Sequence, residues 1–281
     1  MVIKRRLAAP FVTVLFCVLA FIWLIPVVLS LAVSMKGKTE FLAGNLLDFP
    51  RSFSIFVPNL VSAWQLSELG TTFLNSIFYA SLGTVVAVIF SSLAAYSLTH
   101  LKIRLRNLFF FLIFAGTIFP VQIYLVPLYV MYARLGLYDT KIGLLLFYAA
   151  ISIPFCLLVL RSYFTTIPDS ILEAAVLDGA SSFARYTRLI LPMSVAPIVS
   201  LVLLQYTWIW NDLIFGIILT KSNTTRPIMV SIMMLSGEVY MIGTVPQRVA
   251  AALIASAPPL ALFLALRSYF MRGFRMLTIG S

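Results

Sequence analysis

Charged side chains are scarce in this sequence: Asp, Glu, Lys and Arg make up 10% of its 281 residues, whereas 62% of the residues are hydrophobic. Because soluble domains carry about a quarter charged residues, this composition excludes an ordinary soluble protein and indicates an integral membrane protein. Acidic residues are scarcest, with nine against twenty Lys and Arg, for a net charge of +11. The basic residues stand in short clusters between apolar runs, so we attribute the surplus to membrane topology rather than to binding of nucleic acid.

Cysteine and histidine are also rare. Cys17 and Cys156 both fall inside apolar runs, which leaves no basis for a disulfide framework or a metal site. The single histidine, His100, stands in a basic loop, where we expect a solvated side chain. The sequence shows no acid–base pair, nucleophile triad or cluster of metal ligands. We therefore expect no catalytic residue, no bound metal and no enzyme activity of this chain by itself.

Long apolar runs are abundant. About 20 apolar residues cross a bilayer, and six runs reach or approach that length: 11–34, 71–99, 108–131, 142–160, 193–220 and 249–266. The sequence therefore predicts an all-α integral membrane protein, a single transmembrane domain over 1–281 with six transmembrane helices. Basic residues precede the first run, as in a secretory signal, but the run exceeds a signal core of about 7 to 15 residues. We expect it to be retained as a helix.

The basic residues also predict the orientation of the chain, since Lys and Arg near the ends of spans stay preferentially in the cytoplasm. Twelve fall on one predicted side: Lys4, Arg5, Arg6, Lys102, Arg104, Arg106, Arg161, Arg185, Arg188, Arg267, Arg272 and Arg275. Eight fall on the other side, diluted along longer loops: Lys36, Lys38, Arg51, Arg134, Lys141, Lys221, Arg226 and Arg248. Both termini and the loop between spans four and five are then cytoplasmic.

That loop, residues 169–192, is a polar helix-forming segment between two apolar spans. Small residues at Ala174 and Ala175 leave one helical face low enough for close packing, and Gly179 favours a break in the helix. Ser170 and Glu173 have the spacing of a capping box. A helix–Gly–helix elbow at a membrane surface fits either docking of another protein or interfacial contact with lipid. The residues alone favour docking but leave both open.

The same segment resembles the EAA loop of binding-protein-dependent ABC importer permeases. The family pattern is EAA, three residues, Gly, nine residues, Ile, any residue, Leu-Pro. The positions that match are Glu173, Ala174, Ala175, Gly179, Leu191 and Pro192, and Leu189 stands where Ile is usual. In that family the loop is a coupling helix seated in a groove of a cytoplasmic ATPase. The resemblance thus predicts a coupling helix between spans four and five.

The resemblance also implies roles for individual residues. Glu173 would face a basic residue in the ATPase groove, Ala174 and Ala175 would pack against the groove wall, and Gly179 would provide the bend. Asp178, which precedes Gly179, and the pair Leu191-Pro192 complete the set of expected ATPase-coupling residues.

Further stretches extend the resemblance over about Asn75 to Gly273 and point to the carbohydrate branch, similar to the second maltose permease subunit. They are 92–96 (SLAAY), 127–129 (PLY), 134–137 (RLGL), 167–168 (IP), 210–212 (WND) and 270–273 (FMRG). The resemblance implies a homologous permease subunit, two ATPase subunits and an extracytoplasmic solute-binding protein as partners. The chain has no GxxxxGK[ST] phosphate loop. We therefore expect no cofactor in this chain, and ATP and Mg in the separate ATPase subunits.

Polar residues inside spans are costly in hydrocarbon and often face a partner helix or a wet cavity. Gln122, Gln205, Asn211 and Asp212 qualify as candidates for the translocation pathway. At 1.5 Å per residue from Pro192, Asp212 lies about 30 Å along its span, near the outer surface. An interfacial or helix-contact role is therefore at least as strong an interpretation of Asp212 as contact with solute.

The favoured hypothesis is a permease subunit that translocates a sugar or oligosaccharide across the bacterial cytoplasmic membrane by ATP-driven alternating access. An importer of polyols or glycerol phosphates with the same architecture is an alternative. A self-sufficient, ion-coupled secondary transporter is less favoured, because no Asp or Glu lies in the middle of a span.

Overall fold

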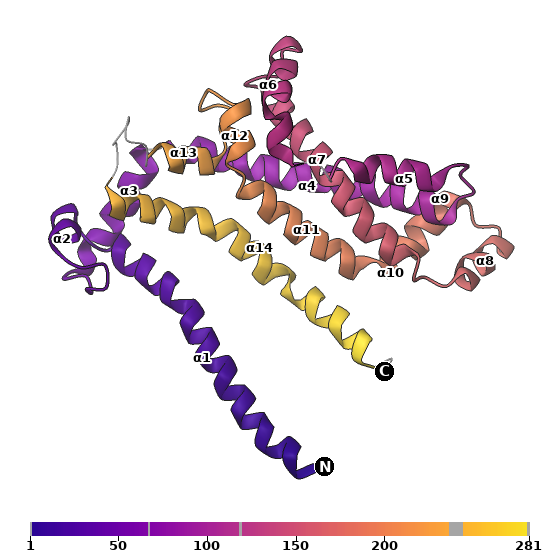
Figure 1. Ribbon diagram of the computed structural model, residues 1–281, viewed down its shortest axis with the longest axis horizontal. Helices are drawn as coiled ribbons and strands as arrows, with labels where there is room; N and C mark the ends of the chain where they lie inside the picture. The colour runs from indigo at the N-terminus through magenta and orange to yellow at the C-terminus, as the bar shows by residue number, and fades with distance from the viewer. Residues whose placement is uncertain (1, 67, 118–119, 236–243, 280–281) are drawn as a thin grey trace. The chain divides into compact units, whose positions relative to one another are not determined.

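The structure is a computed structural model that describes residues 2–66, 68–117, 120–235 and 244–279; side chains are not described at 2–11, 121–122 and 270–279. In chain order its helices are α1 (Val2–Ser34), α2 (Lys38–Ala43), η1 (Phe53–Ile55), α3 (Phe56–Leu66), α4 (Leu69–His100), α5 (Arg106–Ala115), η2 (Val121–Tyr124), α6 (Leu125–Arg134), α7 (Lys141–Phe164), α8 (Asp169–Leu177), α9 (Ser182–Arg185), η3 (Tyr186–Ile190), α10 (Leu191–Met193), α11 (Val195–Trp210), α12 (Ile214–Leu219), α13 (Ile228–Met234) and α14 (Val245–Ile279) (Figure 1). No strand occurs among these residues, so the predicted helical membrane fold is confirmed.

Within the described residues, four helices are long and apolar enough to cross a membrane: Val12–Ser34 in α1, α4, α7 and Val245–Tyr269 in α14. A fifth span results if Ser182–Met193 and Val195–Trp210, which meet at a bend of 75°, are counted together. The predicted third span, 108–131, contains most of α5, the short η2 and most of α6 rather than one helix. The count of six spans therefore stays a prediction.

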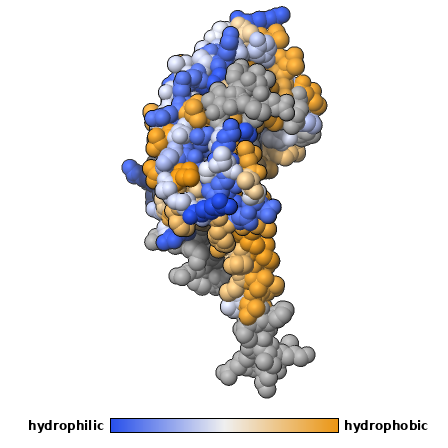
Figure 2. Space-filling view, turned by 90° about the vertical axis from the view of Figure 1, so that its left-hand side faces the viewer, coloured by the Kyte–Doolittle hydropathy of each residue, from blue (hydrophilic) through white to orange (hydrophobic). Residues whose placement is uncertain are grey.

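The chain divides into two compact units, one made of Met1–Leu69 and Ser231–Ser256, the other of Gly70–Val230 and Ala257–Ser281. In the first unit, α1 presents a column of hydrophobic residues (Figure 2). No residue in its most apolar 18-residue window is buried in the described structure. An apolar helix with this exposure requires lipid or another subunit around it.

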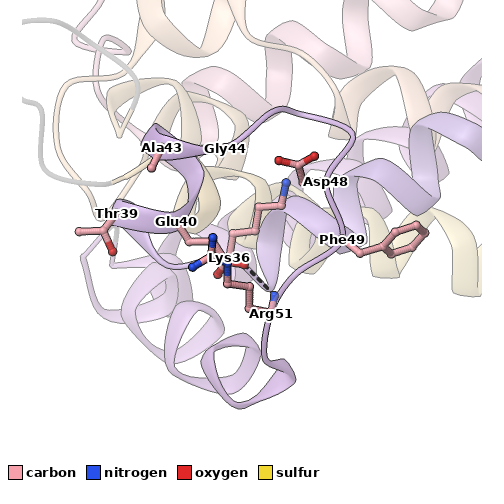
Figure 3. A pocket seen from close by; sticks show the side chains of 8 residues that line it. All are labelled: Lys36, Thr39, Glu40, Ala43, Gly44, Asp48, Phe49 and Arg51. Carbon is pink, nitrogen blue, oxygen red and sulfur yellow. Dashed lines mark hydrogen bonds between the residues drawn. The ribbon is translucent and has the colours of Figure 1, made fainter.

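Residues 36–51 of the same unit fold back on themselves around a buried lysine (Figure 3). Lys36 is only 1% exposed, and its Nζ donates to the carbonyl oxygens of Asn45 at 3.0 Å and Leu46 at 3.4 Å. Glu40 accepts the backbone N–H groups of Gly37 and Arg51, the latter at 2.7 Å. Because buried polar groups are costly unless they are paired, these bonds give a loop with little apolar core a defined conformation.

In the second unit, α4, α7 and α11 pack closely. A Cβ atom added at Gly83 of α4 would lie 3.2 Å from Ile209 Cδ1 and 3.5 Å from Tyr148 Cβ. Small residues let helices approach in this way, and van der Waals packing then holds them together within a membrane. Leu157, Leu160 and Phe164 of α7 are fully buried in the resulting core.

The N-terminal half of α4 holds the loop 221–227. The side-chain amide of Asn75 donates to the carbonyl oxygens of Asn223 and Arg226, at 3.1 and 3.0 Å. Ser76 Oγ accepts the N–H of Ile228 at 2.8 Å, and Tyr79 donates to the carbonyl oxygen of Thr225 at 2.7 Å. These bonds attach the loop to this end of α4.

Asp139, between α6 and α7, accepts hydrogen bonds from the same loop. Its Oδ1 accepts the N–H groups of Lys221 at 2.8 Å and Ser222 at 3.0 Å, together with the hydroxyl of Thr225. Burial alone would raise the pKa of Asp139, but the hydrogen bonds to its ionised form outweigh burial and lower that pKa below its ordinary value of 3.8.

Candidate coupling site

A short helix, α8 (Asp169–Leu177), lies where the sequence predicts a coupling helix, and it follows Pro168. No side chain caps its N-terminus, and Ser170 lies inside the first turn. The capping box expected between Ser170 and Glu173 is therefore wrong. Pro168 suits the position because proline fixes φ near its helical value and has no N–H to leave unpaired.

One side of α8 is anchored and the rest is exposed. Leu172 is buried, at 5% exposure, in the core cluster that includes Phe164 and Ile190. Glu173 and Ala174 are exposed and Ala175 is partly buried, while Leu177 is 89% exposed. An apolar side chain so open at the end of a polar helix marks a surface suited to contact with another molecule.

The carboxylate of Glu173 is unpaired within the described part of the chain, where it makes no hydrogen bond or ion pair. It borders a cleft of about 730 Å³ between α8 and the C-terminal end of α4. The walls also contain Asp169, Leu172, Val176 and Leu177 from α8, and Thr99, His100, Leu101, Lys102 and Arg185. Glu173 thus has space beside it for a basic partner group.

α8 ends at Leu177, and the predicted break in the helix follows at Gly179. Gly179 has φ +77°, a left-handed conformation that L side chains rarely adopt. Its N–H bonds to the carbonyl of Val176 at 3.0 Å, and that of Ala180 bonds to Ala175 at 2.9 Å. This pair of bonds is the Schellman motif. Nothing lies within 4 Å of an added Cβ, so the backbone conformation rather than crowding calls for glycine.

Beyond the break, Ser181 caps α9 by accepting the N–H of Ala184 at 3.2 Å. The chain continues through η3, which is a π-helix, and α10, which contains Leu191 and Pro192. The 75° bend follows at Ser194, before α11 begins. Leu191 and Pro192 therefore stand where the polar segment turns into a span, and are separated from Glu173 by the Gly179 break.

His100 does not match its expected place in a solvated loop. It is the last residue of α4, and its side chain is only 4% exposed. Its Nδ1 lies 4.0 Å from Oδ1 of Asp169, the first residue of α8. The prediction was wrong because the sequence cannot show that α4 extends to residue 100 and is then covered by α8.

The pathway candidates are not brought together around one cavity. Gln205 is buried, at 6% exposure, and hydrogen-bonds Cys156 of α7. Asp212 accepts the hydroxyl of Tyr148 at 2.8 Å and the N–H of Gly216 at 3.0 Å. Asn211 donates to the carbonyl of Thr207 in its own helix at 2.8 Å. The side chain of Gln122 lies outside the described residues. Gln205 and Asp212 thus make helix contacts in this structure.

Comparison with known proteins gives the family. Residues 87–276 match the family of binding-protein-dependent transport system inner membrane components. This chain belongs to that family. It is 31% identical over 264 residues to the osmoprotective compounds uptake permease protein GgtD of Synechocystis sp. (strain ATCC 27184 / PCC 6803 / Kazusa), covering 91% of this chain and 87% of GgtD. The match shows that it is an inner-membrane transport component and not a catalytic enzyme.

Two further similarities extend over nearly the whole permease. The melibiose/raffinose/stachyose import permease protein MelC of Bacillus subtilis (strain 168) is 28% identical over 267 residues, covering 93% of each chain. A chain in the crystal structure of a bacterial ABC transporter involved in the import of the acidic polysaccharide alginate superposes with a TM-score of 0.75. That superposition covers 94% of this permease and 97% of the other chain at 24% identity, and it supports the fold.

Proposed function

We propose that this permease is a transmembrane subunit of an ATP-driven importer for a sugar or oligosaccharide. The observation that carries the proposal is the exposed, unpaired Glu173 on a short helix that ends in a Schellman turn at Gly179, in a chain of the binding-protein-dependent family. The carbohydrate class rests on the similarity to MelC, whose name states that it imports melibiose, raffinose and stachyose.

In the proposed assembly, one homologous permease subunit, two ATPase subunits and an extracytoplasmic solute-binding protein join this chain in a bacterial cytoplasmic membrane. Both termini and α8 face the cytoplasm. ATP and Mg bind the ATPase subunits. A basic group of the ATPase pairs with Glu173, Ala174 and Ala175 pack against the ATPase, and Leu177 adds apolar contact. Movement of α8 as the ATPases close and open then alternates access to the pathway.

A polyol or a glycerol phosphate is the second candidate for the solute, since the similar protein GgtD is named for the uptake of osmoprotective compounds. An ion-coupled secondary transporter is the remaining alternative and is disfavoured by Asp212. This carboxylate, on the predicted fifth span, is engaged by Tyr148 and Gly216, whereas ion-coupled transporters place carboxylates at a mid-membrane ion site.

The test has two parts. The complex with its partner permease and ATPases is reconstituted in proteoliposomes, and uptake of radiolabelled solute is measured with ATP or with an ion gradient. We expect uptake that requires internal ATP and the binding protein. Uptake by this chain alone under an ion gradient would overturn the proposal.

The solute class is tested separately with the cognate binding protein. Its thermal unfolding is measured against saccharides, polyols and phosphorylated glycerols. A shift with one saccharide class is expected. A shift only with glycerol phosphates or polyols would withdraw the sugar assignment and leave the ATP-driven assembly standing.

A further inference from the structure

One face of α4 carries Ser92, Tyr96 and His100, spaced by four residues and therefore stacked on successive turns. We call these three residues the α4 stripe. Ser92 Oγ and Tyr186 Oη lie 2.6 Å apart in a buried hydrogen bond. Tyr96 donates to the carbonyl oxygen of Ser182 at 3.0 Å. The stripe thus contacts both the π-helix η3 and α9, far away in sequence.

Aromatic contacts reinforce these bonds. The ring of Tyr96 lies 5.3 Å from that of Tyr186 and 5.7 Å from the ring of His100. His100 in turn lies 4.0 Å from Asp169 at the start of α8. Among the described residues, every side-chain hydrogen bond that joins 169–188 to the rest of the chain ends on α4. The segment 169–188 is thus attached to α4 by one buried and one part-buried hydrogen bond.

The opposite half of α4 holds the loop 221–227 through Asn75, Ser76 and Tyr79. From Ser76 to Tyr96 the helix rises about 30 Å, at 1.5 Å per residue, which is about the thickness of the hydrocarbon core. One continuous helix is thus bonded near one end to the segment that contains α8, and near the other end to a loop that the charge pattern places outside the cell.

The π-helix at Tyr186–Ile190 is the second unusual feature of this contact. π-helical turns are rare and frequently occur at functional sites. Tyr186, its first residue, is 6% exposed and is the residue that bonds Ser92. The wide turn thus begins at the contact with α4 and is followed by the 75° bend.

We propose that α4 is the element that transmits movement of the coupling helix across the membrane, with Ser92, Tyr96 and Tyr186 as positioning residues. Pulling α8 and α9 moves α4 through the stripe, and α4 moves the loop 221–227 through its other end. This inference rests on the proposed ATP-driven function and goes beyond it, because it assigns the internal route and three residues that do not touch the ATPase.

The test uses the full reconstituted complex with Tyr186→Phe, Ser92→Ala and the double variant. The measured quantity is the ATP hydrolysed per solute imported. Each single variant removes the buried hydrogen bond between Ser92 and Tyr186, and Ser92→Ala also removes the bond from Ser92 Oγ to the carbonyl oxygen of Ile89 in its own helix. We expect this ratio to rise about fivefold or more, as loss of a buried hydrogen bond allows, while ATP hydrolysis and assembly persist. The double variant should be no worse than the singles, because both groups belong to one interaction.

Tyr163→Phe is the matched control. It also removes one tyrosine hydroxyl bond, to the carbonyl of Met193 at 2.8 Å, but that bond comes from α7 and not from α4. We expect its ratio to stay at the wild-type value. A spin label at Lys221→Cys, in a Cys17→Ser background, reports the far loop. Its ATP-dependent spectral change should be lost in Tyr186→Phe and kept in Tyr163→Phe.

The outcomes separate this inference from the proposed function. An unchanged ratio and an unchanged spectral response in Tyr186→Phe would overturn transmission through α4, while ATP-dependent uptake would leave the importer assignment intact. Equal losses in Tyr186→Phe and Tyr163→Phe would show a general structural effect and also overturn it. If Ser92→Ala fails to assemble, Tyr96→Phe, which keeps its ring and loses only the bond to Ser182, provides the same readout.

Discussion

Two polar segments of this permease, 36–51 and 169–179, use their charged side chains in opposite ways. In the first, the ammonium of Lys36 and the carboxylate of Glu40 bond to backbone groups of the same segment. In the second, Glu173 has no partner within the described chain and Leu177 is 89% exposed. A segment that satisfies its own polar groups holds its conformation by itself, whereas one that leaves them open is available to a partner.

The largest expected effect is that of Glu173→Lys. Reversing the charge opposes any basic group of the ATPase and leaves the segment's own conformation unaltered, because Glu173 has no internal partner. Solute uptake by the reconstituted complex should fall at least about tenfold, in line with loss of a buried charge pair at an interface. Glu40→Lys is the control and should leave the ATPase subunits bound. Wild-type uptake in Glu173→Lys would contradict the contrast between the two segments.

Gly179→Val should have a somewhat smaller effect on uptake. A β-branched residue is strained at φ +77°, so the Schellman turn rearranges and α8 changes direction. We expect a loss of uptake of about fivefold to tenfold, from strain of about 1–3 kcal/mol. Co-purification of the ATPase subunits measures the docking directly. Gly136→Val, at another left-handed glycine with φ +67°, controls for strain alone and should retain ATPase binding.

Lys36→Met tests the segment 36–51, whose charged side chains bond to its own backbone. The methionine keeps most of the apolar stem but removes the donor to the carbonyl oxygens of Asn45 and Leu46. Unpaired buried carbonyl groups cost about 1–3 kcal/mol, so limited proteolysis should cut residues 36–51 several times faster than in the wild type. Lys38→Met removes a nearby lysine without a described bond and should leave the cleavage rate unchanged. Equal cleavage rates in all three proteins would mean that Lys36 does not hold this segment.

The smallest expected effect is the pH dependence at Asp139. Like Glu40, this carboxylate accepts backbone N–H groups of the chain. Since its folded pKa is lowered, its contribution to stability is fully present above the unfolded value of 3.8 and is lost as pH falls through the lower folded pKa. Hydrogen exchange, corrected for intrinsic rates, should show protected amides at Lys221 and Ser222 at neutral pH and reduced protection below pH 3.8. Asp139→Asn should show little change in protection over that acidic range. Protection in the wild type that rises as pH falls would refute the assignment.

The sequence predicted the parts of the fold and site that depend on neighbours along the chain. Apolar runs predicted helices that correspond to α1, α4, α7 and α14. The spacing of Glu173 and Gly179 predicted a short helix followed by a break, which the structure shows as α8 and the left-handed Gly179. The prediction failed at His100 and at the Ser170 capping box, because both depend on where α4 ends and α8 begins. The roles of the coupling residues remain predictions for the experiments above.

The sequence did not predict the hydrogen-bonded pairs that connect distant segments of this permease, and the reason is the same for each pair. Ser92 meets Tyr186, Tyr96 meets Ser182 and Asp139 meets Lys221 across 94, 86 and 82 positions. The four-residue spacing of Ser92, Tyr96 and His100 was visible, but helix spacing alone does not say which segment faces the stripe. Composition and local spacing determined that this is a membrane protein and that the polar segment 169–192 breaks at Gly179. Both features follow from hydropathy and from the backbone conformation of single residues. Only the tertiary structure decided which buried hydroxyl and carboxylate groups meet, because their partners come from segments that folding alone brings into contact.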